Sequence, residues 1–156
     1  MKRKRLIAIA VPIGLVALGV ASTFVVMTRE RICKPLELAF RITARTNPET
    51  GAPWDRGPER MRPPDPTGWV LVETDGKRRS EGIALRRNTF GFRGRFYAKT
   101  GVRLRMGSKI EIQVLDKDLA GAQLIGKIIH TVKSVSFGGA VSENGAVEVT
   151  YTCHTD

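Results

Sequence analysis

The stretch Val114–Gly126, VLDKDLAGAQLIG, ends an apolar alternating run with two aspartates and closes on Leu-Ile-Gly. Side chains two residues apart on an extended strand point the same way, so Asp116 and Asp118 can face one site while Lys117 points elsewhere. The whole chain carries a net charge of +11, so a gathering of carboxylates needs an explanation. The stretch predicts a β-strand that leads into a binding loop.

Other segments alternate apolar and polar residues in the same way, which is typical of half-buried strands. We expect strands at 36–44, 68–73, 109–114 and 146–151, and shorter ones at 80–86, 92–99, 126–130 and 132–135. Turn residues separate these runs, and Gly138-Gly139 is interpreted as one such turn. Seven or eight short strands without a helical stripe predict an all-β antiparallel sandwich.

A long irregular segment, Asn47–Thr67, separates the first two predicted strands and holds six of the eight prolines. It carries Asp55 and Asp65. If this loop and the loop after residue 115 lie at the same end of the sandwich, the four carboxylates of Asp55, Asp65, Asp116 and Asp118 converge. Such crowding is unfavourable without a cation, and hard oxygen ligands on flexible loops suit calcium.

The uncharged segment Leu6–Met27 follows the basic residues Lys2 to Arg5. As a helix it would span roughly 33 Å, enough to cross a bilayer. We interpret residues 1–28 as a transmembrane signal anchor and 29–156 as the sandwich domain; a signal peptide cut after Ala21 is the alternative. The positive-inside rule puts the amino terminus in the cytoplasm and the domain outside, in a periplasm or the extracellular space.

The only two cysteines, Cys33 and Cys153, lie near the two ends of the predicted domain. In an oxidising compartment they can form a disulfide, and in a sandwich whose first and last strands are neighbours it would join the termini. Two buried free thiols are the alternative.

Three short motifs in order resemble the C2 domain, the calcium-dependent lipid-binding sandwich of protein kinase C and the synaptotagmins. They are Asp65-Pro before a strand, Arg87-Asn-Thr-Phe, and Val114-Leu-Asp-Lys-Asp with Ile125-Gly126. The resemblance covers about Pro35 to Val135. It implies an eight-stranded sandwich with calcium ligands at Asp55 and Asp65 in the first loop and at Asp116 and Asp118 in the third.

Two features depart from the family pattern. Gln123 stands where many calcium-binding members have a further aspartate, so its amide oxygen could coordinate but adds no charge. The first loop is longer than usual, so Glu49 or Glu59 could replace Asp55 as a ligand. The alternative for Asp116 and Asp118 is ordinary turn chemistry, in which the carboxylates accept hydrogen bonds from loop amides.

Positive charge is concentrated between Lys77 and Lys109, with eleven basic residues and one acidic residue. Arginine side chains suit phosphate, and a basic sheet face of this family often binds anionic lipid. A solvated face that keeps the domain soluble is the alternative, and nucleic acid is not expected. The expected anion-binding residues are Arg86, Arg87, Arg93, Arg95, Lys99, Arg103 and Arg105.

No nucleophile arrangement or nucleotide-binding motif accompanies the two histidines, His130 and His154, so we do not expect an enzyme. The sequence predicts a membrane-tethered, C2-like binding module with calcium as its cofactor and anionic lipid or another acidic surface as its partner. The alternative is a metal-free structural or protein-interaction module of an envelope assembly.

Overall fold

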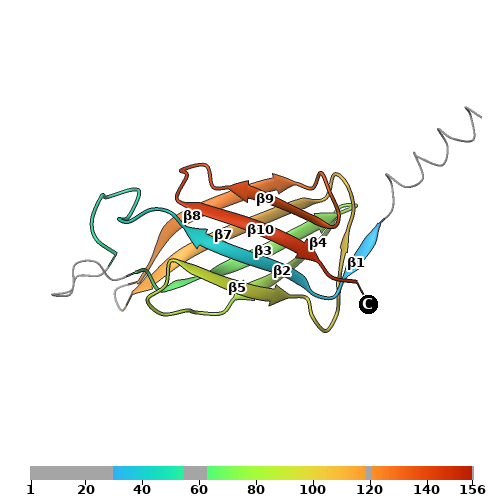
Figure 1. Cartoon of the computed structure of the whole chain (residues 1–156), viewed down its shortest axis with the longest axis horizontal. Helices are drawn as coiled ribbons and strands as arrows, with labels where there is room; N and C mark the ends of the chain where they lie inside the picture. The colour runs from blue at the N-terminus through green and yellow to red at the C-terminus, as the bar shows by residue number, and fades with distance from the viewer. Residues whose placement is uncertain (1–29, 55–62, 119–120, 156) are drawn as a thin grey trace, which may run out of the picture.

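A computed structural model describes residues 30–54, 63–118 and 121–155. They form two four-stranded antiparallel sheets and one two-stranded sheet (Figure 1). The strands are β1 (Arg31–Cys33), β2 (Leu36–Ile42), β3 (Pro66–Thr74), β4 (Lys77–Ile83), β5 (Gly91–Phe96), β6 (Val102–Leu104), β7 (Lys109–Asp118), β8 (Gly121–Thr131), β9 (Phe137–Val141) and β10 (Val147–Cys153).

The first four-stranded sheet has the order β5-β2-β10-β9 and the second has the order β4-β3-β7-β8. Every neighbouring pair is antiparallel. The expected all-β, eight-stranded antiparallel sandwich is therefore present, with β1 and β6 as an additional pair. In this arrangement β4 and β5 flank one side of the sandwich, and β8 and β9 flank the other.

Buried and more exposed residues alternate along the central strands, and the buried residues form the core. In β2, Leu36, Leu38, Phe40 and Ile42 are buried, and the residues between them are more exposed. The inward positions of β3, β7 and β10 pack against them from both sheets. This is the arrangement expected when each sheet buries one face and leaves the other to solvent.

The two cysteines are joined by a disulfide, Cys33–Cys153, with an S–S distance of 2.06 Å. It links β1 to the end of β10, and Lys34 N–H donates to the carbonyl of His154 beside it. The predicted disulfide is thus confirmed, and both ends of the domain are fastened at one end of the sandwich (Figure 1).

Two local expectations were wrong. Residues 132–135 form no strand, and Gly138-Gly139 lies inside β9 instead of in a turn. Gly138 is required there by packing, because a Cβ atom at this position would come within 2.5 Å of the Tyr151 ring. A glycine pair can therefore mark a close side-chain contact as well as a turn.

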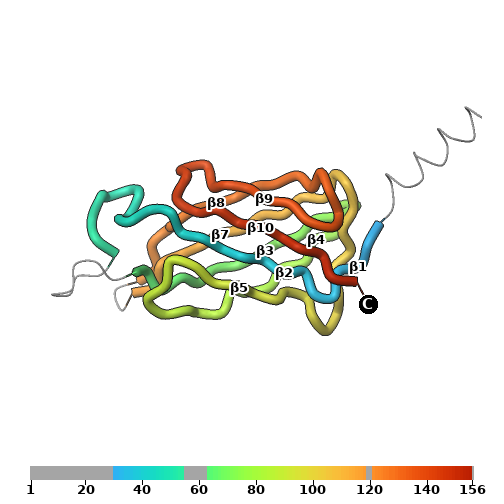
Figure 2. The backbone as a smooth tube through the Cα atoms, in the orientation of Figure 1, coloured from blue at the N-terminus to red at the C-terminus, as the bar shows by residue number. Residues whose placement is uncertain are grey.

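Different parts of the chain lie at the two ends of the sandwich. One end holds β1 and the disulfide, and the loop that follows β2 lies at the other end (Figure 2). The described residues contain no helix long and apolar enough to cross a membrane, and the predicted span Leu6–Met27 lies outside them.

Candidate functional site

The three motifs that carry the sequence resemblance meet at the end of the sandwich away from the disulfide. Asp65 N–H donates to Asp116 Oδ1 at 2.7 Å. Asp65 Oδ1 accepts from the backbone N–H of Asn88 at 2.6 Å, and the Asp65 carbonyl accepts from Lys117 N–H at 3.1 Å. The loop before β3, the loop before β5 and the end of β7 are therefore held together by aspartates.

Asp116 is the last buried residue of β7, after Ile110, Ile112 and Val114, and is only 1% exposed. Its carboxylate thus lies at the edge of the core, and Asp118 follows two residues later on the same strand. Asp116 accepts a hydrogen bond from the loop amide of Asp65. This is the alternative role expected for it, in which a carboxylate orders a turn.

Gln123 lies opposite Asp116 in the β7–β8 ladder. Its Oε1 accepts from Asn47 Nδ2 at 2.5 Å. Asn47 is 2% exposed, and its Oδ1 accepts the N–H groups of Glu49 and Thr50. Asn47 was not among the residues predicted for the site, although Asn-Pro at 47–48 is a recognised turn signal that indicates an ordering role.

The described side chains do not complete the predicted calcium site. In residues 30–54, 63–118 and 121–155, no three Asp, Glu, His or Cys side chains form a group able to hold a metal ion. Calcium takes six to eight oxygen ligands, and the Asp65–Asp116 contact alone is too small a set. Asp55, the remaining predicted ligand, and Glu59, its alternative, lie outside the described residues.

The predicted basic residues are not brought to one face. Arg93 and Arg95 extend from β5 over the outer side of its sheet, whereas Arg86 and Arg87 lie in the loop before β5. Lys99, Arg103 and Arg105 lie near or on β6, toward the disulfide end of the domain.

Acidic partners offset several of these charges. Glu37 lies 3.8 Å from Arg93 and 3.6 Å from Arg95, and Arg103 pairs with Glu30 at 3.0 Å. Arg105 pairs with Asp75. Exposed pairs of this kind stabilise by only about 0 to 1 kcal/mol, so they reduce the local field without holding the arginines rigidly.

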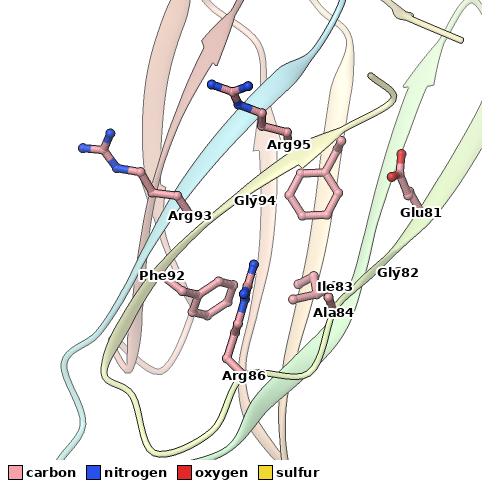
Figure 3. Close-up of a pocket in the computed structure, with 10 residues that line it drawn as sticks. Glu81, Gly82, Ile83, Ala84, Arg86, Phe92, Arg93, Gly94 and Arg95 are labelled. Atoms are coloured by element: carbon pink, nitrogen blue, oxygen red, sulfur yellow. The ribbon is translucent and has the colours of Figure 1, made fainter. Parts of the chain in front are cut away.

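A groove of about 190 Å³ separates β4 from β5 (Figure 3). Ile83, Phe92 and Phe96 line it, and the Arg86 side chain extends between Phe92 and Ile83 (Figure 3). Arg93 and Arg95 also line the groove, but their side chains leave β5 on the side away from Ile83 (Figure 3), where both pair with Glu37. Among the described residues no ion pair involves Arg86, so of the three arginines that line the groove it is the one whose charge no neighbouring carboxylate offsets.

Tyr97 and Glu81 fix the far end of the groove. Tyr97 N–H donates to Glu81 Oε2, and the Tyr97 hydroxyl reaches the carbonyls of Val70 and Arg79 at 3.1 and 3.0 Å. Burial, reinforced by the Glu81 charge, raises the pKa of the Tyr97 hydroxyl, which therefore stays protonated as a donor.

Comparison with solved structures found nine similar chains, among them a C2 domain and a human phospholipase. A structure described as that of a C2 domain is 15% identical, covers 75% of this chain and 96% of its own, and gives a TM-score of 0.40. Human GIVD cytosolic phospholipase A2, in complex with methyl gamma-linolenyl fluorophosphonate and terbium chloride, is 12% identical with a TM-score of 0.43. That match covers 82% of this chain and 18% of the phospholipase chain.

No protein-family model and no curated protein matches the chain in sequence. At 12 to 15% identity, the structural likeness assigns no role to any residue of this chain. The structure itself is an eight-stranded antiparallel sandwich, and the three motifs of the sequence resemblance meet at one of its ends.

Proposed function

We propose that the chain is a membrane-associated binding module that holds phosphate-bearing anionic lipid in the β4–β5 groove. The observation that supports this most strongly is the groove of about 190 Å³ in which Arg86 lies beside apolar walls. A guanidinium offers forked donors to a phosphate, and the apolar walls suit the glycerol and acyl parts of a lipid. No catalytic role is proposed for any residue.

The position of the groove favours contact with the membrane that carries the predicted tether, Leu6–Met27. The chain enters the domain at the disulfide end. The seven residues of β2 span roughly 20 Å or more from there to the opposite end, the aspartate end, where Asp65 contacts Asp116. A tethered, outward-facing domain would therefore direct Asp65 and Asp116 away from the tether. The side formed by β4 and β5 can reach the same bilayer when the domain lies along it.

Vesicle binding by the fragment that begins at Thr28 tests this function, since the buried core lies between Cys33 and Cys153. Binding should rise when phosphatidic acid is added to phosphatidylcholine vesicles and fall with salt. Arg86→Ala should weaken binding roughly fivefold to tenfold, as expected from about 1 kcal/mol for a basic residue near an anionic surface.

Arg78→Ala is the matched control, because it removes the same charge from a side chain that pairs with Glu73 and does not line the groove. It should weaken binding less than Arg86→Ala. Equal losses in the two variants would rule out the groove, and binding that ignores lipid charge and salt would rule out the anionic surface.

We also propose that calcium, as the family resemblance implies, binds where Asp55 joins Asp65, Asp116, Asp118 and Gln123. The hydrogen bond between Asp65 and Asp116 supports this in part, because it brings two of the predicted loops into contact. Hard oxygen donors are the correct ligand type, and no step of lipid binding by Arg86 requires the ion.

Thermal melting separates calcium binding from the metal-free alternative, a structural or protein-interaction module. Calcium should raise the melting temperature relative to chelator, whereas magnesium should not. The double variant Asp116→Asn and Asp118→Asn should keep its fold and lose this calcium response. A wild-type melting temperature that is indifferent to calcium would favour the metal-free module and leave the groove test unaffected.

A further inference from the structure

Strand β9 is an exposed sheet edge of unusual composition. It forms hydrogen bonds with β10 on one side, and Figure 1 shows no described strand beyond it. Phe137 is 69% exposed and Val141 is 57% exposed on its outer face. The nine residues 134–142 carry no charge, whereas the other three edge strands, β4, β5 and β8, each contain lysine or arginine.

Proteins usually protect an exposed edge with charge, proline or a bulge, because unpaired backbone groups invite another strand. Within β9 the structure contains none of these devices. The composition of this edge therefore suits a partner strand better than permanent exposure to solvent.

The hydrogen bonds at both ends of β9 show which backbone groups face outward. Cys153 N–H donates to the Ser136 carbonyl, and Ser142 N–H donates to the Val147 carbonyl. In an antiparallel ladder such bonding positions alternate. The N–H and C=O groups of Phe137, Gly139 and Val141 consequently point away from β10.

Phe137, Gly139 and Val141 are spaced symmetrically about Gly139, so the edges of two copies of β9 can pair with each other. If a second β9 lies antiparallel with the two Gly139 residues opposite each other, each outward-facing residue is in a hydrogen-bonding position, giving about six backbone bonds. Phe137 of each copy then lies opposite Val141 of the other. Aromatic and β-branched side chains are a favourable cross-strand pair, and Gly139 leaves the centre open.

The charges that flank the uncharged edge have opposite signs. Lys133 precedes it and Glu143 follows it. Antiparallel pairing of two copies would bring the positive end of one strand toward the negative end of the other, which favours a second copy over a strand with like charges at both ends.

We propose that β9 is a dimerisation edge, at which two copies of this chain pair antiparallel about Gly139 in an isologous, two-fold interface. The two four-stranded sheets that contain β9 would join into one continuous sheet. This interface is on the side of the sandwich opposite the β4–β5 groove, so it covers the groove in neither copy.

Sedimentation of the full chain in detergent micelles tests the proposal with two variants that introduce opposite charges into β9. The wild-type chain should form a dimer whose population rises with concentration. Phe137→Glu and Val141→Lys should each weaken dimerisation about tenfold or more, because each puts a charge opposite an apolar side chain. An equimolar mixture of the two variants should restore the dimer, because the two introduced charges then face each other.

Ile129→Lys is the matched control, since Ile129 is also 57% exposed but lies on β8. It should leave dimerisation unchanged, and thermal melting should confirm that all three variants fold. A monomeric wild-type chain, or a dimer that neither β9 variant weakens, would overturn the proposal. Failure of the mixture to recover would overturn the register about Gly139.

Discussion

Tyr97 shows how much of this fold depends on a single polar side chain. It directly follows β5 with a φ of 58°, a left-handed conformation that is uncommon for residues other than glycine. Its hydroxyl reaches the carbonyls of Val70 and Arg79 in the other sheet, and its N–H donates to Glu81. The residue therefore fastens the end of β5 across the groove to β3 and β4.

We expect Tyr97→Phe to lower the free energy of unfolding by about 1 kcal/mol, because it removes a buried hydroxyl that donates to carbonyls of β3 and β4. Urea denaturation followed by tryptophan fluorescence measures the change. A shift within about 0.5 kcal/mol, as at an ordinary surface position, would show that these hydrogen bonds do not hold the sheets together.

The residues at the aspartate end mark how far the sequence predicts the site. The sequence predicted that Asp116 would face a site shared with Asp65 if their two loops lie at one end of the sandwich; the two residues do lie side by side there, with Asp116 buried. The sequence could not show that the backbone N–H groups of Asp65 and Asn88 would hydrogen-bond to these carboxylates. Such bonds depend on how the loops fold back, which no periodic pattern encodes.

Among the strands, the sequence predicts the long buried ones better than the short edge ones. The alternating runs correspond to β2, β3, β7 and β10, the two central strands of each sheet, where both pairing and burial act. Strands β1, β6 and β9 were missed. They are three to five residues long, and their position depends on the disulfide, on each other or on β10.

Gly68 controls the pairing of the two central strands of the second sheet. It has a φ of 142°, and a Cβ atom at this position would lie 1.8 Å from the backbone oxygen of Gln113. No small side-chain movement relieves a clash with backbone, so β3 and β7 approach closely only because this residue is glycine.

Gly68→Ala should therefore destabilise the domain by roughly 3 kcal/mol or more, the range of severe overpacking and backbone strain. Gly82→Ala on β4 is the control, since a Cβ atom there would have no neighbour nearer than 4.0 Å. The denaturation midpoints should fall for the first variant and stay or rise slightly for the second. Equal midpoints would contradict the close approach at Gly68.

At the scale of the whole molecule, the disulfide, the aspartates, the arginine groove and the β9 edge lie on different sides or ends of the domain. The disulfide closes a loop of 120 residues at the end where the chain enters, and the chain-entropy model assigns such a bridge roughly 4 to 5 kcal/mol. The aspartates occupy the opposite end, the arginine groove one side, and the uncharged β9 edge the other. Composition predicted a basic domain, but only the sheet order shows that its charges divide among several surfaces.

The most direct test of the central claim is to map a lipid onto the fragment by amide chemical shifts. Dihexanoyl phosphatidic acid, kept monomeric, would be titrated into the isotopically labelled protein. Binding at the β4–β5 groove predicts that the largest shifts fall on residues 83–86 and 92–96, and that Arg86→Ala reduces them. Shifts confined to residues 47–52 and 121–123 at the aspartate end, or no shifts at all, would contradict it.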